Sequence, residues 1–400
     1  MTVTEAQEPA PTQGDLSSKI ELSVVIPCLN ESRTLGTCIR KAQGSFERLG
    51  IRGEVVVADN GSTDGSQAIA SELGARVVPV AERGYGSALS AGIAAASGRW
   101  VVMGDADDTY DFANLEPFVE ALRDGFDVVN GNRFKGGIEP GAMPWLHRWL
   151  GNPALSFIGR RLYRTSCSDL YCGLRAFDRE KVLALDVRSA GMEFALEMLV
   201  KATMRGLRVT EVPTTLSPDV KGREPHLRTW RDGWRSMRLL LLYSPRWLFL
   251  YPGVFLFVVG AAGMAWLLPG QRPLAGVTFD VSTLVYFALA AVVGLQGIYF
   301  FLTARWFGIT EGLLPDDARV RRLVSGRTPE IGLLAGLALL AGGLALSLYA
   351  LATWNHAGFG RLDYPHTLRI VIPGATLITC GIQTALFALF VGVLGLRRRH

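Results

Sequence analysis

The chain has 400 residues, of which 49% are apolar and 19% are charged, and its mean hydropathy is +0.24. This balance excludes an ordinary soluble enzyme, because the chain is too apolar, and a pure membrane bundle, because it is too charged. The net charge of +5 comes from arginines beside long apolar segments, which indicates anionic lipid and no nucleic acid as a partner. We therefore expect a soluble part and a membrane part in one chain.

The N-terminal half alternates short β-branched runs with amphipathic stretches. Residues 1–20 are rich in Pro, Thr, Gln and Glu and lack an apolar core, which predicts a disordered lead and no signal peptide. In residues 21–225 we expect strands at 22–26, 54–58, 76–80, 100–104 and 127–130, and helices at 34–48, 66–73, 86–96, 114–123, 145–163 and 188–205. Such alternation predicts an α/β domain with a mostly parallel, Rossmann-like sheet covered on both faces.

Polar side chains follow four of the expected strands, in residues 27–31, 59–64, 105–108 and 131–133. Ligands of open parallel sheets bind beyond the carboxyl ends of the strands, so these four loops should meet at one site. Asp105 and Asp107 offer the carboxylate oxygens that Mg²⁺ or Mn²⁺ prefers, and such ions bridge phosphate oxygens. The pattern predicts transfer of a group from a donor that contains a diphosphate.

Three segments resemble, in order and spacing, motifs of the family 2 inverting glycosyltransferases with the GT-A fold: VVIPCLNE at 24–31, ADNGSTDG at 58–65 and GDADD at 104–108. With an amphipathic segment and a few spans after it, the domain is most similar to the polyprenyl-phosphate sugar synthases, relatives of dolichol-phosphate mannose synthase. The resemblance implies transfer of one hexose, mannose or glucose, from a GDP- or UDP-sugar to a polyprenyl phosphate.

The resemblance also implies which residues bind the donor. The nucleotide would contact Pro27, Leu29, Asn30, Glu31, Asp59, Asp105, Ala106, Arg133 and Arg223. Among these, Asp59 would accept a hydrogen bond from the base. Asp105 and Asp107 would hold the metal ion. Members often have Tyr and Gln where this chain has Leu29 and Thr109, so the choice between GDP and UDP stays open, and Asp108, Thr109 or water would complete the metal shell.

Three residues are expected to act in the reaction: Asp107, Arg133 and Asp169. A planar guanidinium such as that of Arg133 suits phosphate oxygens. A lipid phosphate is already an anion near neutral pH, because its second pKa is about 6, and needs no protein base. A sugar hydroxyl would need a carboxylate, for which Asp108 or Asp169 is the candidate. The resemblance places Asp169 on the acceptor side.

The C-terminal part predicts a membrane domain, residues 247–400. Residues 226–246 place apolar residues and arginines on separate stripes of a helix, which predicts an interfacial helix or a basic lead into the first span. Four apolar segments are long enough to cross a bilayer: 247–268, 281–301, 331–351 and 370–396. The arginine-rich loops predict a multi-pass protein of the plasma or inner membrane, with its catalytic domain and both termini in the cytoplasm. A homo-oligomer is compatible with the sequence.

Two alternatives remain. One is a membrane glycosyltransferase that uses a sugar hydroxyl or another lipid acceptor, although the Gln-x-x-Arg-Trp motif of polysaccharide synthases is absent. The other is a non-catalytic scaffold that binds nucleotide sugars, which the presence of both Asp105 and Asp107 disfavours. Two further patterns have structural interpretations: Glu193 and Glu197 suit a packing helix, and the glycine-rich residues 83–87 suit a tight turn before a helix.

Overall fold

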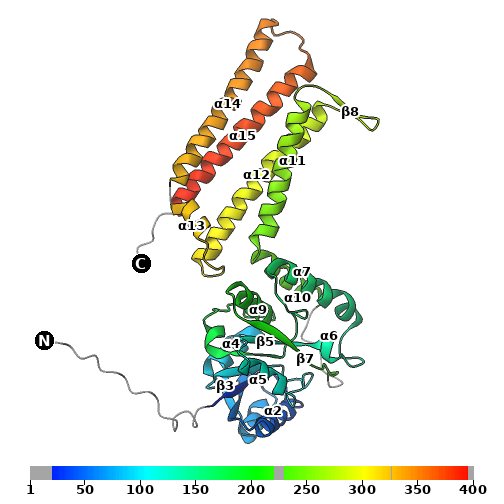
Figure 1. The fold of residues 1–400 in the computed structure, drawn as a ribbon, viewed down its shortest axis with the longest axis vertical. Coiled ribbons are helices and arrows are strands. Elements are labelled where there is room, and N and C mark those ends of the chain that lie inside the picture. The colour runs from blue at the N-terminus through cyan, green and yellow to red at the C-terminus, as the bar shows by residue number, and fades with distance from the viewer. Residues whose placement is uncertain (1–19, 220–228, 326, 395–400) are drawn as a thin grey trace, which may run out of the picture. The chain divides into compact units, whose positions relative to one another are not determined.

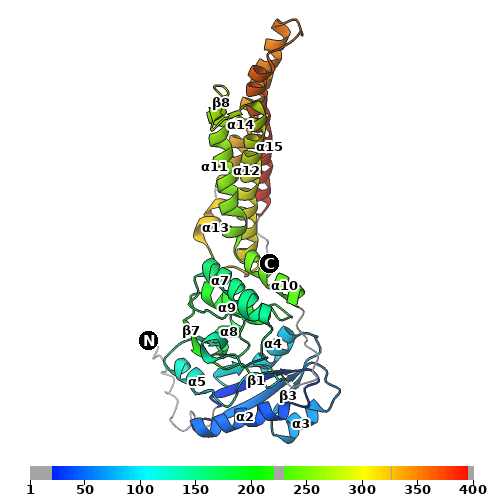
Figure 2. The ribbon, with the colours of Figure 1, turned by 90° about the vertical axis from the view of Figure 1, so that its right-hand side faces the viewer.

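The computed structural model describes residues 20–219, 229–325 and 327–394. The chain divides into two compact units, Met1–Leu240 and Leu241–His400 (Figures 1 and 2). The predicted disordered lead falls on residues 1–19, and Arg223 and the last six residues also lie outside the described residues.

The first unit contains a seven-stranded sheet with the order β3-β2-β1-β4-β6-β5-β7. Its strands are β1 (Leu22–Cys28), β2 (Gly53–Asp59), β3 (Arg76–Pro79), β4 (Trp100–Met103), β5 (Val128–Asn132), β6 (Arg175–Asp178) and β7 (Val209–Pro213). All neighbouring strands are parallel except β6, which runs antiparallel to both β4 and β5. The sheet confirms the predicted mostly parallel α/β architecture.

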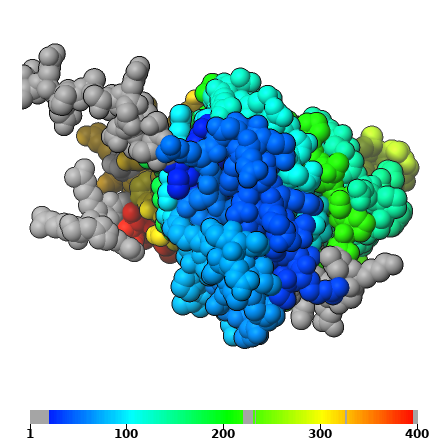
Figure 3. Space-filling view, turned by 90° about the horizontal axis from the view of Figure 1, so that it is seen from below, coloured from blue at the N-terminus to red at the C-terminus, as the bar shows by residue number. Residues whose placement is uncertain are grey.

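Helices cover both faces of this sheet. The helices between β1 and the second unit are α2 (Leu35–Leu49), α3 (Ser66–Glu72), α4 (Tyr85–Ala95), α5 (Glu116–Arg123), α6 (Arg133–Gly136), the π-helix η1 (His147–Gly151), α7 (Asn152–Tyr163), α8 (Arg179–Leu183), α9 (Phe194–Met204) and α10 (Thr229–Leu242). The core on one face joins β1 to α2 and α5. On the opposite face α4 approaches so closely that a Cβ at Gly92 would lie 2.5 Å from Val25. The surface of α2 and α3 is blue in Figure 3.

The structure differs from the sequence prediction at several elements. β6 and β7 were not expected: β6 reads Arg-Ala-Phe-Asp, has no β-branched residue, and exists because it pairs with strands on both sides. The helix expected at 145–163 begins with a π-helical turn. The helix expected at 188–205 begins only at Phe194, and the backbone N–H groups of Arg188 and Ser189 before it donate to the side chain of Glu197.

Glu197 is a buried structural acceptor. Its carboxylate pairs with Lys201 at 2.7 Å, both side chains being about 2% exposed, and accepts hydrogen bonds from the backbone N–H groups of Arg188 and Ser189. By contrast, Glu193 lies 3.7 Å from Arg235, whose side chain is 49% exposed. Glu197 therefore supports the packing interpretation of this helix.

We expect Glu197→Ala to destabilise the first unit by about 3–5 kcal/mol, because it leaves the ammonium group of Lys201 buried without its carboxylate. Glu193→Ala removes a more exposed pair and should cost about 1 kcal/mol or less. Thermal unfolding of the full-length protein in detergent measures both changes. Equal melting temperatures for the two variants would contradict the prediction.

The second unit is helical apart from one hairpin. Its elements are the π-helix η2 (Arg246–Leu250), α11 (Tyr251–Leu267), β8 (Arg272–Leu274), β9 (Val277–Phe279), α12 (Val281–Thr310), α13 (Ala318–Ser325), α14 (Thr328–His356) and α15 (Tyr364–Leu394). Within the part of the chain that the structure describes, four helices are long and apolar enough to cross a membrane: Arg246–Leu267, Val281–Thr310, Thr328–His356 and Tyr364–Leu394. The predicted bundle of four apolar helices is therefore confirmed, while β8 and β9 were not expected.

Glycines bring these helices together in pairs. A Cβ at Gly260 of α11 would lie 2.4 Å from the backbone N of Ala291 in α12, and one at Gly336 of α14 would lie 2.6 Å from that of Ala385 in α15. Small residues allow such close backbone packing where no hydrophobic force drives helices together in lipid. Between the pairs, the ring of Tyr299 stacks on Phe387 with 4.2 Å between centroids.

Candidate active site

The topology of the sheet brings all four predicted loops to one edge. Because β6 is antiparallel to both β4 and β5, β5 runs in the same direction as β4, and residues 131–133 after β5 emerge at the same edge. β1 lies between β2 and β4 and is parallel to both. Cys28 at the end of β1 is in register with Asp59 at the end of β2. The residues that follow β1, β2 and β4 therefore emerge side by side, as the sequence pattern requires for a shared site.

The first two loops hold each other through hydrogen bonds. The backbone N–H of Asn30 donates to Ser62 Oγ at 2.9 Å, and that of Thr63 donates to Asn30 Oδ1 at 2.8 Å. The backbone N–H of Glu31 donates to the buried Ser66 Oγ at 3.0 Å. Leu29 is 42% exposed, whereas Pro27 belongs to the fully buried strand β1. The loop after β1 thus exposes the apolar side chain of Leu29, which a ligand could contact.

Asp59 lies at this edge but is almost fully buried, with 2% of its surface exposed. Its carboxylate accepts hydrogen bonds from the backbone N–H groups of Gly61 and Ser62 and from the side chain of Gln67. These bonds shape the turn after β2. The predicted contact between Asp59 and a nucleotide base stays a prediction.

The third loop carries the candidate metal ligands. Ala106, between them, is buried. Asp105 Oδ1 accepts a hydrogen bond from the hydroxyl of Tyr85 at 2.8 Å. Asp107 Oδ1 accepts one from the hydroxyl of Thr109 at 2.7 Å. Two carboxylates, together with water and substrate phosphates, are the usual ligands of Mg²⁺ in nucleotide sites. Asp105 and Asp107 therefore fit the predicted cation.

The other two candidates for the metal shell are used within the protein. Asp108 has a φ of 59° and pairs with Lys41 at 2.8 Å. The hydroxyl of Thr109 holds Asp107, as described above. Within the described residues, no group of three or more His, Cys, Asp and Glu side chains could hold a metal ion. The prediction that water completes the metal shell stays a prediction.

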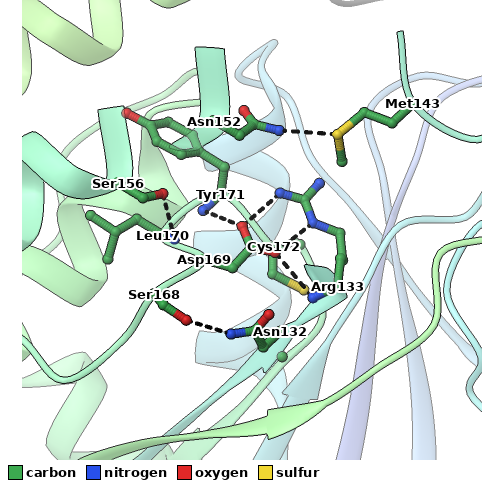
Figure 4. Close-up of polar contacts among 12 residues, drawn as sticks. Asn132, Arg133, Met143, Asn152, Ser156, Ser168, Asp169, Leu170, Tyr171 and Cys172 are labelled. Atoms are coloured by element: carbon green, nitrogen blue, oxygen red, sulfur yellow. Dashed lines mark hydrogen bonds and ion pairs between the residues drawn. The ribbon is translucent and has the colours of Figure 1, made fainter. Parts of the chain in front are cut away.

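Arg133 and Asp169 form a buried, bidentate ion pair (Figure 4). Arg133 Nε lies 2.8 Å from Asp169 Oδ2, and a terminal nitrogen of Arg133 lies 2.8 Å from Oδ1. The backbone N–H groups of Arg133 and Tyr171 also donate to this carboxylate, at 3.1 and 3.3 Å. Asp169 is 0% and Arg133 7% exposed. A carboxylate with four such bonds does not suit the general-base role considered for Asp169; it suits a residue that positions Arg133.

Arg133 keeps its charge in this environment. Burial works against the charged guanidinium, but the hydroxyl group of Tyr110 and the hydrogen-bonded carboxylate of Asp169 outweigh it and raise the pKa of Arg133. Arg133 follows β5 directly, as residue one of α6, and the side chain of Asn132 caps that short helix. The site therefore contains a fixed guanidinium whose charge is balanced by Asp169, and such a planar group suits phosphate oxygens.

Sequence reasoning missed a second buried guanidinium, that of Arg175 in β6. It is 0% exposed and donates to the backbone oxygens of Leu170, Cys172 and Ala195. These bonds hold the loop that carries Asp169. The signal was an arginine inside an otherwise apolar run, Leu174 to Phe177. Tyr85 and Tyr110 were missed as well, because nothing in the sequence indicates their partners.

The chain belongs to glycosyl transferase family 2. The model of that family, "Glycosyl transferase family 2", matches residues 23–185, and that of the "Glycosyltransferase family 2 C-terminal transmembrane region" matches residues 302–395. A similar protein of Haloferax volcanii, the low-salt glycan biosynthesis hexosyltransferase Agl6, is 34% identical over 94% of this chain and 89% of the relative. The dolichyl-phosphate hexose transferase of the same organism is 34% identical over 48% of this chain and 81% of the relative.

Among solved structures, glucosyl-3-phosphoglycerate synthase from Mycobacterium tuberculosis in complex with phosphoglyceric acid is 25% identical. The match covers 59% of this chain and 85% of the synthase, with a TM-score of 0.44.

Proposed function

We propose that this protein transfers a single hexose, mannose or glucose, from a GDP- or UDP-sugar to a polyprenyl phosphate at the cytoplasmic face of the membrane. The observation that carries the proposal is that two carboxylates, Asp105 and Asp107, and the buried guanidinium of Arg133 follow strands that end at the same edge of the sheet. This site belongs to a family 2 chain that continues into four apolar helices. The names of the two Haloferax relatives, a hexosyltransferase and a dolichyl-phosphate hexose transferase, support the hexose and the lipid acceptor.

The acceptor phosphate is the nucleophile in this proposal. One of its oxygens forms a bond to the anomeric carbon of the donor, while the bond from that carbon to the diphosphate breaks and the nucleoside diphosphate leaves with the electron pair. Attack opposite the leaving group inverts the anomeric carbon. Arg133 contacts phosphate oxygens, and Asp169 keeps its guanidinium in place. Because the nucleophile is already an anion, no side chain has to remove a proton.

A divalent cation, Mg²⁺ or Mn²⁺, held by Asp105 and Asp107 would neutralise negative charge on the diphosphate. The protein's own part is to fix the two carboxylates at the end of β4, one through Tyr85 and one through Thr109. The fixed carboxylates also disfavour the alternative of a non-catalytic scaffold, because a protein that only binds nucleotide sugars would not need both side chains held in this way.

Exposed tryptophans on the first unit support an acceptor in the bilayer. Trp145, just before η1, is 72% exposed, and Trp149, within η1, is 65% exposed. In α10, Trp230 is 83% exposed and Trp234 is 65% exposed. Tryptophan prefers the membrane–water interface, and arginines accompany these residues on both segments. We propose that this surface lies in the head-group region, so that a lipid phosphate can reach Arg133.

The proposal is tested with membranes from cells that overproduce the chain. They are incubated with Mg²⁺ or Mn²⁺, a short polyprenyl phosphate, and labelled GDP- and UDP-linked mannose or glucose. We expect label in the organic phase from one donor, and its loss when EDTA is added. The control is the same reaction without polyprenyl phosphate. Label that appears only in water-soluble sugar or polymer would contradict the lipid-phosphate acceptor, and nucleotide binding without any transfer would indicate a scaffold.

A further inference from the structure

The glycine-rich residues 83–87 have a role that a turn alone does not explain. They lead into α4 and form its first turn, in which Tyr85 is the first helical residue. The hydroxyl of Tyr85 donates a 2.8 Å hydrogen bond to Asp105 Oδ1, so this loop reaches the end of β4. The glycine-rich segment thus contacts one of the two candidate metal ligands through the side chain of Tyr85.

Backbone packing holds Tyr85 in place. The backbone N–H groups of Gly86 and Ser87 donate to the backbone oxygen of Ala190, at 2.8 and 3.3 Å. A Cβ at Gly84 would lie 2.2 Å from that oxygen, and one at Gly86 would lie 2.0 Å from the oxygen of Ser189. Both glycines are therefore required for this approach. The segment that they contact is itself anchored by the buried Glu197.

The second oxygen of Asp105 also has a fixed neighbour. A Cβ at Gly173 would lie 2.9 Å from Asp105 Oδ2, so that any other residue there would push on the carboxylate. The backbone N–H of Gly173 donates to the hydroxyl of Tyr110 at 2.8 Å, and this bond keeps Gly173 close. Tyr85 and Gly173 thus confine the carboxylate from two sides.

We infer that Tyr85 is a positioning residue for Asp105, which keeps the carboxylate in the orientation that receives the cation–diphosphate part of the donor. The inference rests on the proposed function, because it takes Asp105 to be a ligand of that group. A carboxylate that is already ordered loses less freedom when it binds. The bond from a neutral hydroxyl to a carboxylate is charge-assisted and is among the stronger hydrogen bonds.

The test compares Tyr85→Phe with the unaltered protein, both full-length in nanodiscs, by calorimetric titration with UDP and with GDP, each with and without MnCl₂. We expect the variant to bind the nucleotide about tenfold more weakly in the presence of Mn²⁺, the loss typical of a hydrogen bond to a charged group. Binding without Mn²⁺ and the melting temperature should change little, because the ring remains. Tyr163→Phe is the matched control, since Tyr163 donates to the backbone oxygen of Leu240 and not to Asp105.

Each other outcome has a distinct meaning. Unchanged Mn²⁺-dependent affinity in Tyr85→Phe would overturn the positioning role and leave the proposed function intact. An equal loss with and without Mn²⁺, or a large drop in melting temperature, would assign Tyr85 to the fold alone. If the unaltered protein bound neither nucleotide in an Mn²⁺-dependent manner, the metal-dependent function and the inference would both fail.

Discussion

Asp107→Ala is expected to lower hexosyl transfer about a thousandfold, with little change in stability. The substitution removes a ligand of the cation that neutralises the departing diphosphate, an effect worth several kcal/mol in the transition state, and each 1.36 kcal/mol is a factor of ten in rate. Asp107 is partly exposed in the loop after β4 and accepts hydrogen bonds from the backbone and the hydroxyl of the neighbouring Thr109, so folding should survive its loss. The measurement is kcat/KM for the donor at saturating Mn²⁺.

Asp111→Ala is the matched control for Asp107→Ala. Asp111 lies four residues further on and accepts a hydrogen bond from the backbone N–H of Ala113, as part of a turn. Its loss should change the rate less than threefold, on the order expected for a surface substitution. If Asp107→Ala retained a tenth or more of the activity, or if the two variants were equally impaired, Asp107 would not be a ligand of the cation.

Breaking the Arg133–Asp169 pair is expected to affect both stability and activity. Asp169→Ala leaves a buried guanidinium without its carboxylate, which typically costs about 3–5 kcal/mol. Arg133 would also lose its orientation, so transfer should fall by at least about a hundredfold, as for misplaced catalytic groups. Thermal unfolding and initial rates measure the two effects. Arg123→Ala, at a pair whose side chains are 46% and 35% exposed, should cost about 1 kcal/mol or less.

A double variant separates the two roles of this pair. Arg133→Met with Asp169→Asn removes both charges, and the amide oxygen of Asn can still accept from the backbone N–H groups of residues 133 and 171. Neutral replacement of a buried ion pair is often close to neutral in stability. We expect the double variant to regain most of the melting temperature that Asp169→Ala loses and to remain inactive. Recovered activity would show that Arg133 does not contact the phosphate groups of the reaction.

Prediction from sequence succeeded where local pattern and structure coincide. β1, β2 and β4 are short apolar runs that end in polar loops, and they form the centre of the sheet. The four apolar helices could be found because a bilayer span needs roughly 20 apolar residues in succession. The acidic loop at Asp105 and Asp107 could be placed at the sheet edge because parallel strands share their direction.

The sequence could not indicate the partners of side chains that meet across the fold. Asp169, a candidate base for a sugar-hydroxyl acceptor, pairs with Arg133, 36 residues away. Asp108, one candidate for the metal shell, pairs with Lys41, 67 residues away. Neither pairing leaves a periodic signal in the sequence, because contacts between loops do not repeat along the chain.

The amino-acid sequence by itself determined that this protein joins an α/β domain to four apolar helices, and that an acidic loop follows a central strand. Hydrophobic periodicity and segment length are local properties, so the sequence alone carries them. The tertiary structure decided that β6 enters the sheet antiparallel, that Asp169 pairs with Arg133, and that the hydroxyl of Tyr85 donates to Asp105. Those outcomes depend on which segments the folded sheet and its helices bring within hydrogen-bond distance, and buried polar groups then take the partners that folding supplies.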